Sequence, residues 1–242
     1  MIVFGVNSVL EALASSSAHI ERVTVAGKRG NARLQEIIDR ARELGIPIHF
    51  EPPESLTRRA GTRAHQSVIA ELSEVSLASL EEVLAARPDR ILLLDGVEDP
   101  RNLGAVLRTA EAIGIRSVLL PKRHSCGVTP TVVRTSAGAA LHLQIGRIGN
   151  VVQALGQLKE SGYWSVGLDM RGSEHPEGID PTSPLVIVIG GEDRGLRRLV
   201  REHCDFLIRL PMRGQVSSLN LSVAAGILLY SLFSDVSPGS SE

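Results

Sequence analysis

RILLLDGVEDPRNLGAVLRTAEAIG, residues 90–114, joins a continuous apolar segment to a helical pattern. The apolar run Ile91 to Leu94 is typical of a strand in a parallel sheet that is covered on both faces. Asp99 and Pro100 then supply a helix N-cap and a first-turn proline. Apolar residues recur at helical spacing from there to Gly114, which can end the helix. The stretch predicts one strand–loop–helix unit of an α/β fold.

The same alternation continues toward the C-terminus. Further strands are expected at residues 117–120, 164–168, 185–189 and 206–210, and further helices at residues 131–137, 150–160, 195–203 and 218–233. Strands that alternate with helices in this order predict a parallel sheet flanked by helices. We therefore expect one α/β domain over residues 90–236.

A smaller α/β unit is expected over residues 1–75. Asn7 can cap a first helix, and a strand pattern follows at residues 22–26. A second helical pattern over residues 34–44 precedes short strands near Ile48 and at residues 67–70. Residues 76–89 are expected to be a linker that runs into a short helix.

Composition indicates an ordinary globular protein. Of the 242 residues, 43% are hydrophobic and 22% are charged. No apolar run reaches the roughly 20 residues that span a bilayer, and the N-terminus lacks the features of a secretory signal, so we expect a cytoplasmic protein. Cys126 and Cys204 are expected to be plain thiols, with no metal site, because no other ligand stands at metal-binding spacing.

The formal net charge of −1 does not by itself indicate a nucleic-acid-binding protein. Two local basic clusters are present: Lys28, Arg29 and Arg33, and Arg58, Arg59, Arg63 and His65. Such clusters form either a solvated surface or a contact for RNA phosphates. Charge alone leaves both interpretations open.

Three segments place polar residues just after predicted strands, where open α/β sheets bind ligands. They are residues 92–114 with Asn102 and Arg108, residues 189–196 with two glycines and an acid, and residues 210–229 with Ser218 and Asn220. No Lys-Ser/Thr pair follows Gly195, and no G-x-G-x-x-G follows a predicted strand, which argues against a phosphate-binding loop or a dinucleotide site. Taken singly, Asn102 and Ser218 could be helix caps and Arg108 an exposed helix charge.

Together, these segments resemble the three motifs of the SpoU family of RNA ribose 2'-O-methyltransferases, in the SPOUT superfamily. D-P-x-N-x-G-x-x-x-R-T-A matches residues 99–110, G-x-E-x-x-G matches residues 190–195, and P-M-x-G-x-x-x-S-L-N-x-S-x-A matches residues 211–224. The segments FGVNSVLEAL and AHQS resemble the N-terminal RNA-binding domain of members that methylate a guanosine of 23S rRNA. Ser67 stands where that resemblance leads us to expect a glycine.

The resemblance implies S-adenosylmethionine-dependent methylation of a ribose 2'-hydroxyl in RNA, with a guanosine of 23S rRNA as the favoured substrate. It implies a small N-terminal RNA-binding α/β domain and a parallel-sheet methyltransferase domain. It also implies a C-terminal trefoil knot, formed from roughly residues 185–233, and a homodimer.

The resemblance also implies roles for individual residues. The catalytic candidates are Asn102, Arg108, Glu192, Ser218 and Asn220. The cofactor-binding candidates are Leu168, Gly190, Gly191, Leu210, Met212 and Leu219. The substrate-binding candidates are Arg58, Arg63, His65 and Arg134, and no metal is implied. A guanidinium loses its proton only at very high pH, so we expect Arg108 to bind a phosphate and steer the hydroxyl, and the base is left open.

Three alternatives remain open. The same reaction could take place on tRNA or on another rRNA nucleotide, although tRNA enzymes of the family usually lack the N-terminal domain. The chain could be an RNA-binding module that has lost catalysis, which the presence of every motif residue disfavours. An unrelated nucleotide-binding enzyme is disfavoured by the missing phosphate loops.

Overall fold

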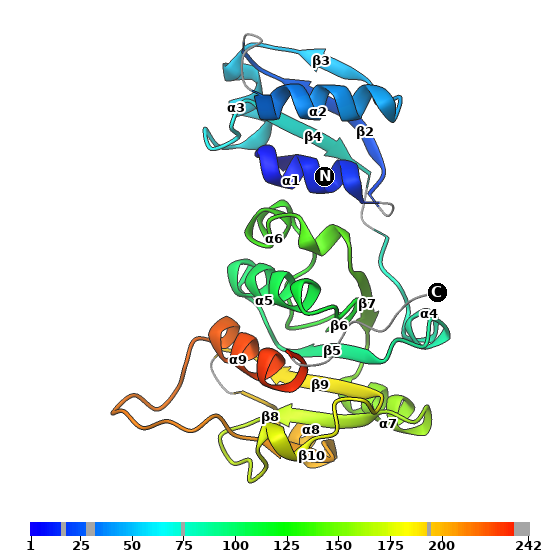
Figure 1. The fold of residues 1–242 in the computed structure, drawn as a ribbon, viewed down its shortest axis with the longest axis vertical. Coiled ribbons are helices and arrows are strands. Elements are labelled where there is room, and N and C mark those ends of the chain that lie inside the picture. The colour runs from blue at the N-terminus through cyan, green and yellow to red at the C-terminus, as the bar shows by residue number, and fades with distance from the viewer. Residues whose placement is uncertain (16–17, 28–31, 74–75, 193–194, 235–242) are drawn as a thin grey trace. The chain divides into compact units, whose positions relative to one another are not determined.

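The computed structural model describes residues 1–15, 18–27, 32–73, 76–192 and 195–234 (Figure 1). The chain forms two compact units. Unit 1 comprises Met1–Ser76 and Val128–His142, and unit 2 comprises Leu77–Gly127 and Leu143–Glu242. Of the basic clusters, Lys28 and Arg29 lie outside the described residues.

Unit 1 is built on a four-stranded mixed sheet. Its strands are β1 (Ile2–Phe4), β2 (Ile20–Val25), β3 (Ile48–Phe50) and β4 (Val68–Leu72), in the order β1-β4-β2-β3. β4 is antiparallel to β1 and β2, whereas β2 and β3 are parallel. The helices are α1 (Val6–Ala14), α2 (Ala32–Glu43) and α3 (Pro53–Ala60). The strand β1 and the helix α3 were not predicted from the sequence.

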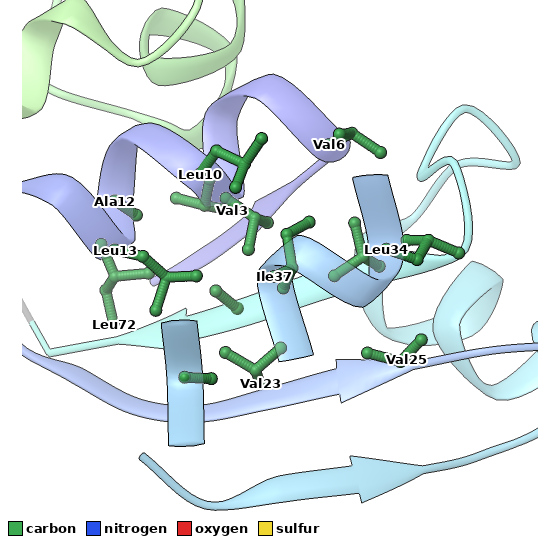
Figure 2. Close-up of a cluster of buried hydrophobic side chains, with 14 of the residues drawn as sticks. Val3, Val6, Leu10, Ala12, Leu13, Val23, Val25, Leu34, Ile37 and Leu72 are labelled. Atoms are coloured by element: carbon green, nitrogen blue, oxygen red, sulfur yellow. The ribbon is translucent and has the colours of Figure 1, made fainter. Parts of the chain in front are cut away.

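Both faces of this sheet are covered, because side chains alternate along its strands. Figure 2 shows apolar side chains of α1 and α2, such as Leu10 and Ile37, packed against Val23 and Leu72 of the sheet. Ile69, between two β4 residues of that core, instead belongs to a smaller cluster under α3 with Leu56, Phe4 and Ala26. Because alternate residues of β4 pack into different clusters, a shift of the strand by one residue would take each side chain out of its cluster. The two clusters therefore fix the register of β4.

The first helix is capped through a tertiary contact. Asn7 lies inside α1, so the expectation that it caps the helix is wrong: the N-cap is Gly5, with φ of 90°. The Gln66 side-chain oxygen accepts a 2.8 Å hydrogen bond from the Val6 amide and satisfies a free helix donor. Gln66 and Ser67 have φ of 51° and 63°. This left-handed region favours glycine, which gives a physical reason for the glycine expected at position 67.

Residues 128–142 pack within unit 1, although they lie between two strands of unit 2 in the sequence. They form α6 (Pro130–Thr135) and a short 3₁₀ helix (Ala139–Leu141). His142 Nε2 lies 2.9 Å from a Glu11 carboxylate oxygen. A Cβ on Gly138 would lie 2.3 Å from the Glu11 Cβ, so α1 and this segment are in close contact.

Unit 2 is built on a six-stranded sheet in which every pairing is parallel, as predicted. Its order is β10-β8-β9-β5-β6-β7. The strands are β5 (Arg90–Asp95), β6 (Ser117–Pro121), β7 (Gln144–Ile148), β8 (Trp164–Leu168), β9 (Leu185–Gly190) and β10 (Phe206–Ile208). The helices are α4 (Leu80–Ala85), α5 (Pro100–Ala112), α7 (Val151–Glu160), α8 (Arg198–His203) and α9 (Leu221–Phe233). Only β7 was not predicted.

The central strands β5 and β9 are buried on both faces, which confirms the interpretation of their continuous apolar sequences. Alternate residues such as Ile91 and Val188 pack under α4, α7 and α8. Figure 1 shows α5 and α9 side by side over the other face. Asp99 caps α5 as predicted, accepting a 2.7 Å hydrogen bond from the Arg101 amide.

The two cysteines are not joined in a disulfide. Burial raises the pKa of the Cys204 thiol to about 12, so it stays protonated at neutral pH. The neighbouring His203 ring lies 2.8 Å from the Leu199 carbonyl oxygen.

Among the described residues, no group of three His, Cys, Asp or Glu side chains is placed to hold a metal ion. No helix among these residues is long and apolar enough to cross a membrane.

Candidate functional site

A cavity of about 440 Å³ lies in unit 2, within the roughly 300–1,000 Å³ range typical of small-molecule sites. It opens where β8 and β9 end and where the chain passes from β10 to α9. Every one of the six cofactor-binding candidates lines it: Leu168, Gly190, Gly191, Leu210, Met212 and Leu219. Two catalytic candidates, Glu192 and Ser218, also line it. Residues far apart in the sequence thus meet at one edge of the sheet.

The glycines at this edge are required by close contacts between backbones. A Cβ on Gly190 would lie 2.0 Å from the carbonyl carbon of Gly195, and one on Gly191 would lie 2.3 Å from the carbonyl oxygen of Gly96. Real side chains do not tolerate such distances. Backbone groups therefore form one wall of the cavity, which allows a ligand to approach the main chain closely.

A chain of side-chain hydrogen bonds links all three motifs. The Asn102 amide nitrogen donates to a Glu192 oxygen at 3.0 Å, and the Asn102 oxygen accepts from the Asn220 amide nitrogen at 3.1 Å. The Asn220 oxygen in turn accepts from the amide of Ser222 at 2.9 Å. These bonds fix the orientation of both asparagine amides. Three catalytic candidates are therefore held in one network beside the cavity.

Ser218 and Asn220 occupy different positions at the start of α9. The helix α9 begins at Leu221, three residues later than predicted, and its N-cap is Asn220. Ser218 is exposed on the loop that lines the cavity, so it does not cap α9. Asn102 likewise does not cap α5, since Asp99 does.

A charged pair in the cavity wall, Asp169 with Arg201, was not predicted from the sequence. Asp169 follows β8, and its carboxylate lies 3.6 Å from the Arg201 guanidinium of α8. Only 9% of the Asp169 side chain and 18% of the Arg201 side chain are exposed. The signal for Asp169 was its place just after a strand, at the carboxyl edge of the sheet. Arg201 lies within a helix and had no such signal.

A second charged pair that was not predicted, Asp95 with Arg197, lies near the glycines of the cavity wall. The Asp95 side chain, at the end of β5, is fully buried and accepts two hydrogen bonds from Arg197, at 3.1 and 2.5 Å. A bidentate pair of this kind has a fixed geometry. It ties the segment just before α8 to the strand that precedes Gly96 and thereby helps to hold Gly195 against Gly190.

Arg108 is not brought into the cavity. It is exposed on α5, six residues beyond Asn102 and so about 9 Å further along the helix axis. It makes no ion pair with any residue that the structure describes. A guanidinium in this position is accessible to an RNA phosphate.

The substrate-binding candidates all belong to unit 1. Arg58 and Arg63 are exposed, at the end of α3 and shortly after it. Arg134 is exposed on α6, with its guanidinium 5.7 Å from the centre of the Phe4 ring. His65 is buried, and its ring nitrogens contact the Thr57 hydroxyl at 3.0 Å and the Ser67 amide at 3.1 Å. His65 therefore holds the turn that carries Ser67.

Comparison with known proteins identifies the family. Residues 89–230 match the SpoU rRNA Methylase family, and residues 2–78 match the family described as RNA 2'-O ribose methyltransferase substrate binding. The chain belongs to the SpoU family. The family, the parallel α/β fold and the methyltransferase activity on RNA, all predicted from the sequence, are thereby confirmed.

Relatives match over nearly the whole chain. A putative TrmH family tRNA/rRNA methyltransferase of Bacillus subtilis, YacO, is 39% identical and covers 98% of this chain and 96% of its own length. The 23S rRNA (guanosine-2'-O-)-methyltransferase RlmB of Xylella fastidiosa is also 39% identical, with 94% of each chain covered.

Solved structures share the fold. A putative TrmH family RNA methyltransferase of Porphyromonas gingivalis is 27% identical, with a TM-score of 0.73 over 96% of this chain and 88% of its own. An AdoMet-bound rRNA methyltransferase of Sinorhizobium meliloti, 23% identical, reaches a TM-score of 0.82 over 98% of this chain and 87% of its own.

Proposed function

We propose that this protein methylates the ribose 2'-hydroxyl of a guanosine in 23S rRNA. The hydrogen-bond chain from Glu192 through Asn102 to Asn220 carries the proposal, because it joins the three SpoU motifs beside one cavity. The relatives named as 23S rRNA guanosine methyltransferases support the choice of substrate, since they match both units of the chain. The tRNA alternative is less well supported: an Aquifex aeolicus TrmH/SpoU tRNA-modifying enzyme covers only 64% of this chain.

The cavity suits S-adenosylmethionine. Its glycines and apolar side chains, among them Leu168, Leu210 and Leu219, provide a partly apolar pocket with main-chain groups for an adenine. Asp169 and Arg201 provide charges of both signs for the zwitterionic amino-acid end. When bound, S-adenosylmethionine supplies an electrophilic methyl group. We propose that binding needs no metal ion.

The remaining work of the protein is to position the hydroxyl and remove its proton. In this proposal, Asn102 and Asn220 orient the reacting nucleotide, and Ser218 shapes the pocket where the ribose enters. Glu192 holds the Asn102 amide in place. Arg108 binds the phosphate next to the ribose, and its fixed positive charge favours the developing oxyanion.

The domain boundaries belong to the same proposal: an RNA-binding domain over residues 1–75, a linker over 76–89 and the methyltransferase domain over 90–236. Arg58, Arg63 and Arg134 contact RNA phosphates, and His65 acts indirectly by holding the turn that carries Ser67.

The proposal also includes the C-terminal trefoil knot. Its support is the close backbone contact of Gly191 with Gly96 and of Gly172 with Leu207 and Ile208, where any side chain would collide with the main chain.

Methyl transfer to an unmodified 23S rRNA transcript tests the proposal directly. We expect labelled S-adenosylmethionine to yield a single 2'-O-methylguanosine, located by mass spectrometry of nuclease fragments. Calorimetry in excess chelator should give the same cofactor affinity as calorimetry with added Mg²⁺. Methylation of tRNA in place of 23S rRNA, or of a nucleotide other than guanosine, would contradict the proposed substrate, and loss of cofactor binding in chelator would contradict the metal-free site.

A homodimer is also part of the proposal. Val223, Ile227 and Tyr230 recur at helical spacing on α9 and are 44–51% exposed, so they form an apolar stripe on the helix that follows the cavity loop. We propose that a second copy of the chain covers this stripe. This arrangement would bring each cavity close to groups of the partner subunit.

Sedimentation velocity at micromolar concentration should show a dimer for the wild type and a monomer for Ile227→Asp, because a charge in an apolar interface remains unpaired. Leu44→Asp is the matched control, since Leu44 is 56% exposed and lies in unit 1. A wild type that sediments as a monomer would rule out the dimer.

A further inference from the structure

Two basic side chains follow β6 directly, at the carboxyl edge of the sheet in unit 2. Lys122 and Arg123 are exposed, and neither forms an ion pair within the described part of the chain. The next residue, His124, lies 3.9 Å from the exposed Glu98 carboxylate. The proposed function assigns no role to these residues. Within the described part of unit 2, no carboxylate neutralises the charge of Lys122 or Arg123.

The loop that carries them is held at both ends. One nitrogen of the Arg147 guanidinium donates to the Lys122 carbonyl at 3.2 Å, and the other donates to the Cys126 carbonyl at 3.3 Å. The Lys122 amide donates to the Ile148 carbonyl at 2.8 Å. Arg147 and Ile148 belong to β7, so the neighbouring strand fixes residues 122–126. A loop that is already fixed loses less conformational entropy when it binds a ligand.

The loop also contacts the connection that leads to Asn102. The Cys126 amide donates to the Val97 carbonyl at 2.9 Å, and the His124 carbonyl lies 3.8 Å from the position of a Cβ on Gly96. Gly96 in turn is in contact with Gly191 of the cavity wall. Three adjacent strands, β9, β5 and β6, therefore end in the cavity turn, the Asn102 loop and the basic loop, in that order.

The spacing of strands sets the distance between these loops. Neighbouring strands lie about 4.8 Å apart, so the basic loop lies roughly 10 Å from the cavity turn. This distance is short enough for one RNA strand to contact both loops. An RNA strand whose ribose reaches the cavity can therefore pass its backbone over residues 122–123.

We propose that Lys122 and Arg123 bind the phosphate backbone beside the reacting nucleotide, as a second RNA contact located in the catalytic unit itself. The inference rests on the proposed function, because it assumes that RNA is the substrate. The chain as a whole carries a net charge of −1, so RNA binding depends on local clusters of this kind. The Lys122 ammonium and the Arg123 guanidinium are both donors that suit phosphate oxygens.

The test compares the wild type with the full-length double variant Lys122→Ala/Arg123→Ala. Filter binding of an unmodified 23S rRNA transcript is measured between about 50 and 200 mM KCl. We expect affinity at the lower salt to fall at least about 10-fold. We also expect the slope of log affinity against log salt to decrease by about 1.4, since each phosphate contact with a single strand contributes roughly 0.7. Cofactor affinity, measured by calorimetry, should stay unchanged and shows that the variant is folded.

Arg116→Ala is the matched control. Arg116 is exposed and immediately precedes β6, so it offers the same charge at the opposite edge of the same strand. Its affinity and salt slope should equal those of the wild type. The single variants Lys122→Gln and Arg123→Gln should each show about half of the decrease in slope that the double variant shows.

An unchanged salt slope with affinity within twofold of the wild type would overturn the proposal, as would an equal loss in Arg116→Ala. If the wild type methylates tRNA instead, the proposed 23S substrate fails, and the same variants measured on tRNA decide the role of the loop separately.

Discussion

Arg108→Ala should reduce methyl transfer about 100-fold or more while leaving the protein folded and its affinity for S-adenosylmethionine near that of the wild type. Arg108 is exposed on α5 and does not line the cavity, so its removal takes nothing from the proposed cofactor pocket. Replacing an exposed helical arginine with alanine changes the free energy of unfolding by under about 0.5 kcal/mol. Losing one well-placed contact to a reacting group typically costs about 100-fold in rate.

Single-turnover methylation at saturating RNA and cofactor measures this effect without the contribution of binding. Arg116→Ala removes the same charge from an exposed position just after α5 and should stay within twofold of the wild type. Arg108→Lys keeps the charge but loses the planar fork and should recover only part of the rate. An Arg108→Ala rate within about threefold of the wild type, worth only roughly 0.6 kcal/mol, would contradict the catalytic assignment.

The sequence predicted the architecture of unit 2 well because its signals are local. The apolar run at Ile91–Leu94 and the cap at Asp99 are read from neighbouring residues, and both hold in the structure. The strand β7 was missed because Gly146 and Arg147 interrupt its apolar pattern. A Cβ on Gly146 would lie 2.7 Å from the end of the Leu119 side chain, and a close contact of that kind cannot be read from the sequence.

The parts of unit 1 that were missed depend on long-range contacts. The start of α1 is set by the side chain of Gln66, sixty residues away, so the local signal at Asn7 was misleading. The packing of residues 128–142 against α1 depends on Gly138 and Glu11, which no periodicity connects. His65 was assigned to a basic cluster by its charge, although its two ring contacts make it a buried part of a turn.

The candidate site was predictable only as a set of motifs. Patterns in the sequence placed Asn102, Glu192 and Asn220 just after strands, and the resemblance to SpoU enzymes gave them a common role. The hydrogen bonds that join them span 90 and 118 residues of sequence, so their mutual geometry needed the fold. The Asp169–Arg201 pair in the cavity wall had no motif to indicate it.

Gly190→Ala should abolish tight cofactor binding and also lower stability. The added Cβ would lie 2.0 Å from the carbonyl carbon of Gly195 and 2.3 Å from the Leu196 amide nitrogen. Both are backbone atoms, so no side chain can rotate away and the turn itself must shift. A misplacement of about 1 Å can cost about 100-fold in catalytic rate, which shows how strongly a site depends on position, and overpacking of a buried position costs about 1–3 kcal/mol. We therefore expect at least about a 100-fold loss in affinity for S-adenosylmethionine.

Calorimetric titration with S-adenosylmethionine and thermal unfolding without it separate the two effects. Gly149→Ala is the matched control: Gly149 is exposed after β7, its Cβ would meet no atom within 4 Å, and both measurements should match the wild type. Should Gly190→Ala fail to fold, Gly191→Ala makes the same test, because its Cβ would lie 2.3 Å from the Gly96 carbonyl oxygen. Cofactor affinity within threefold of the wild type in a folded variant would show that the glycine turn does not form the cofactor-binding wall.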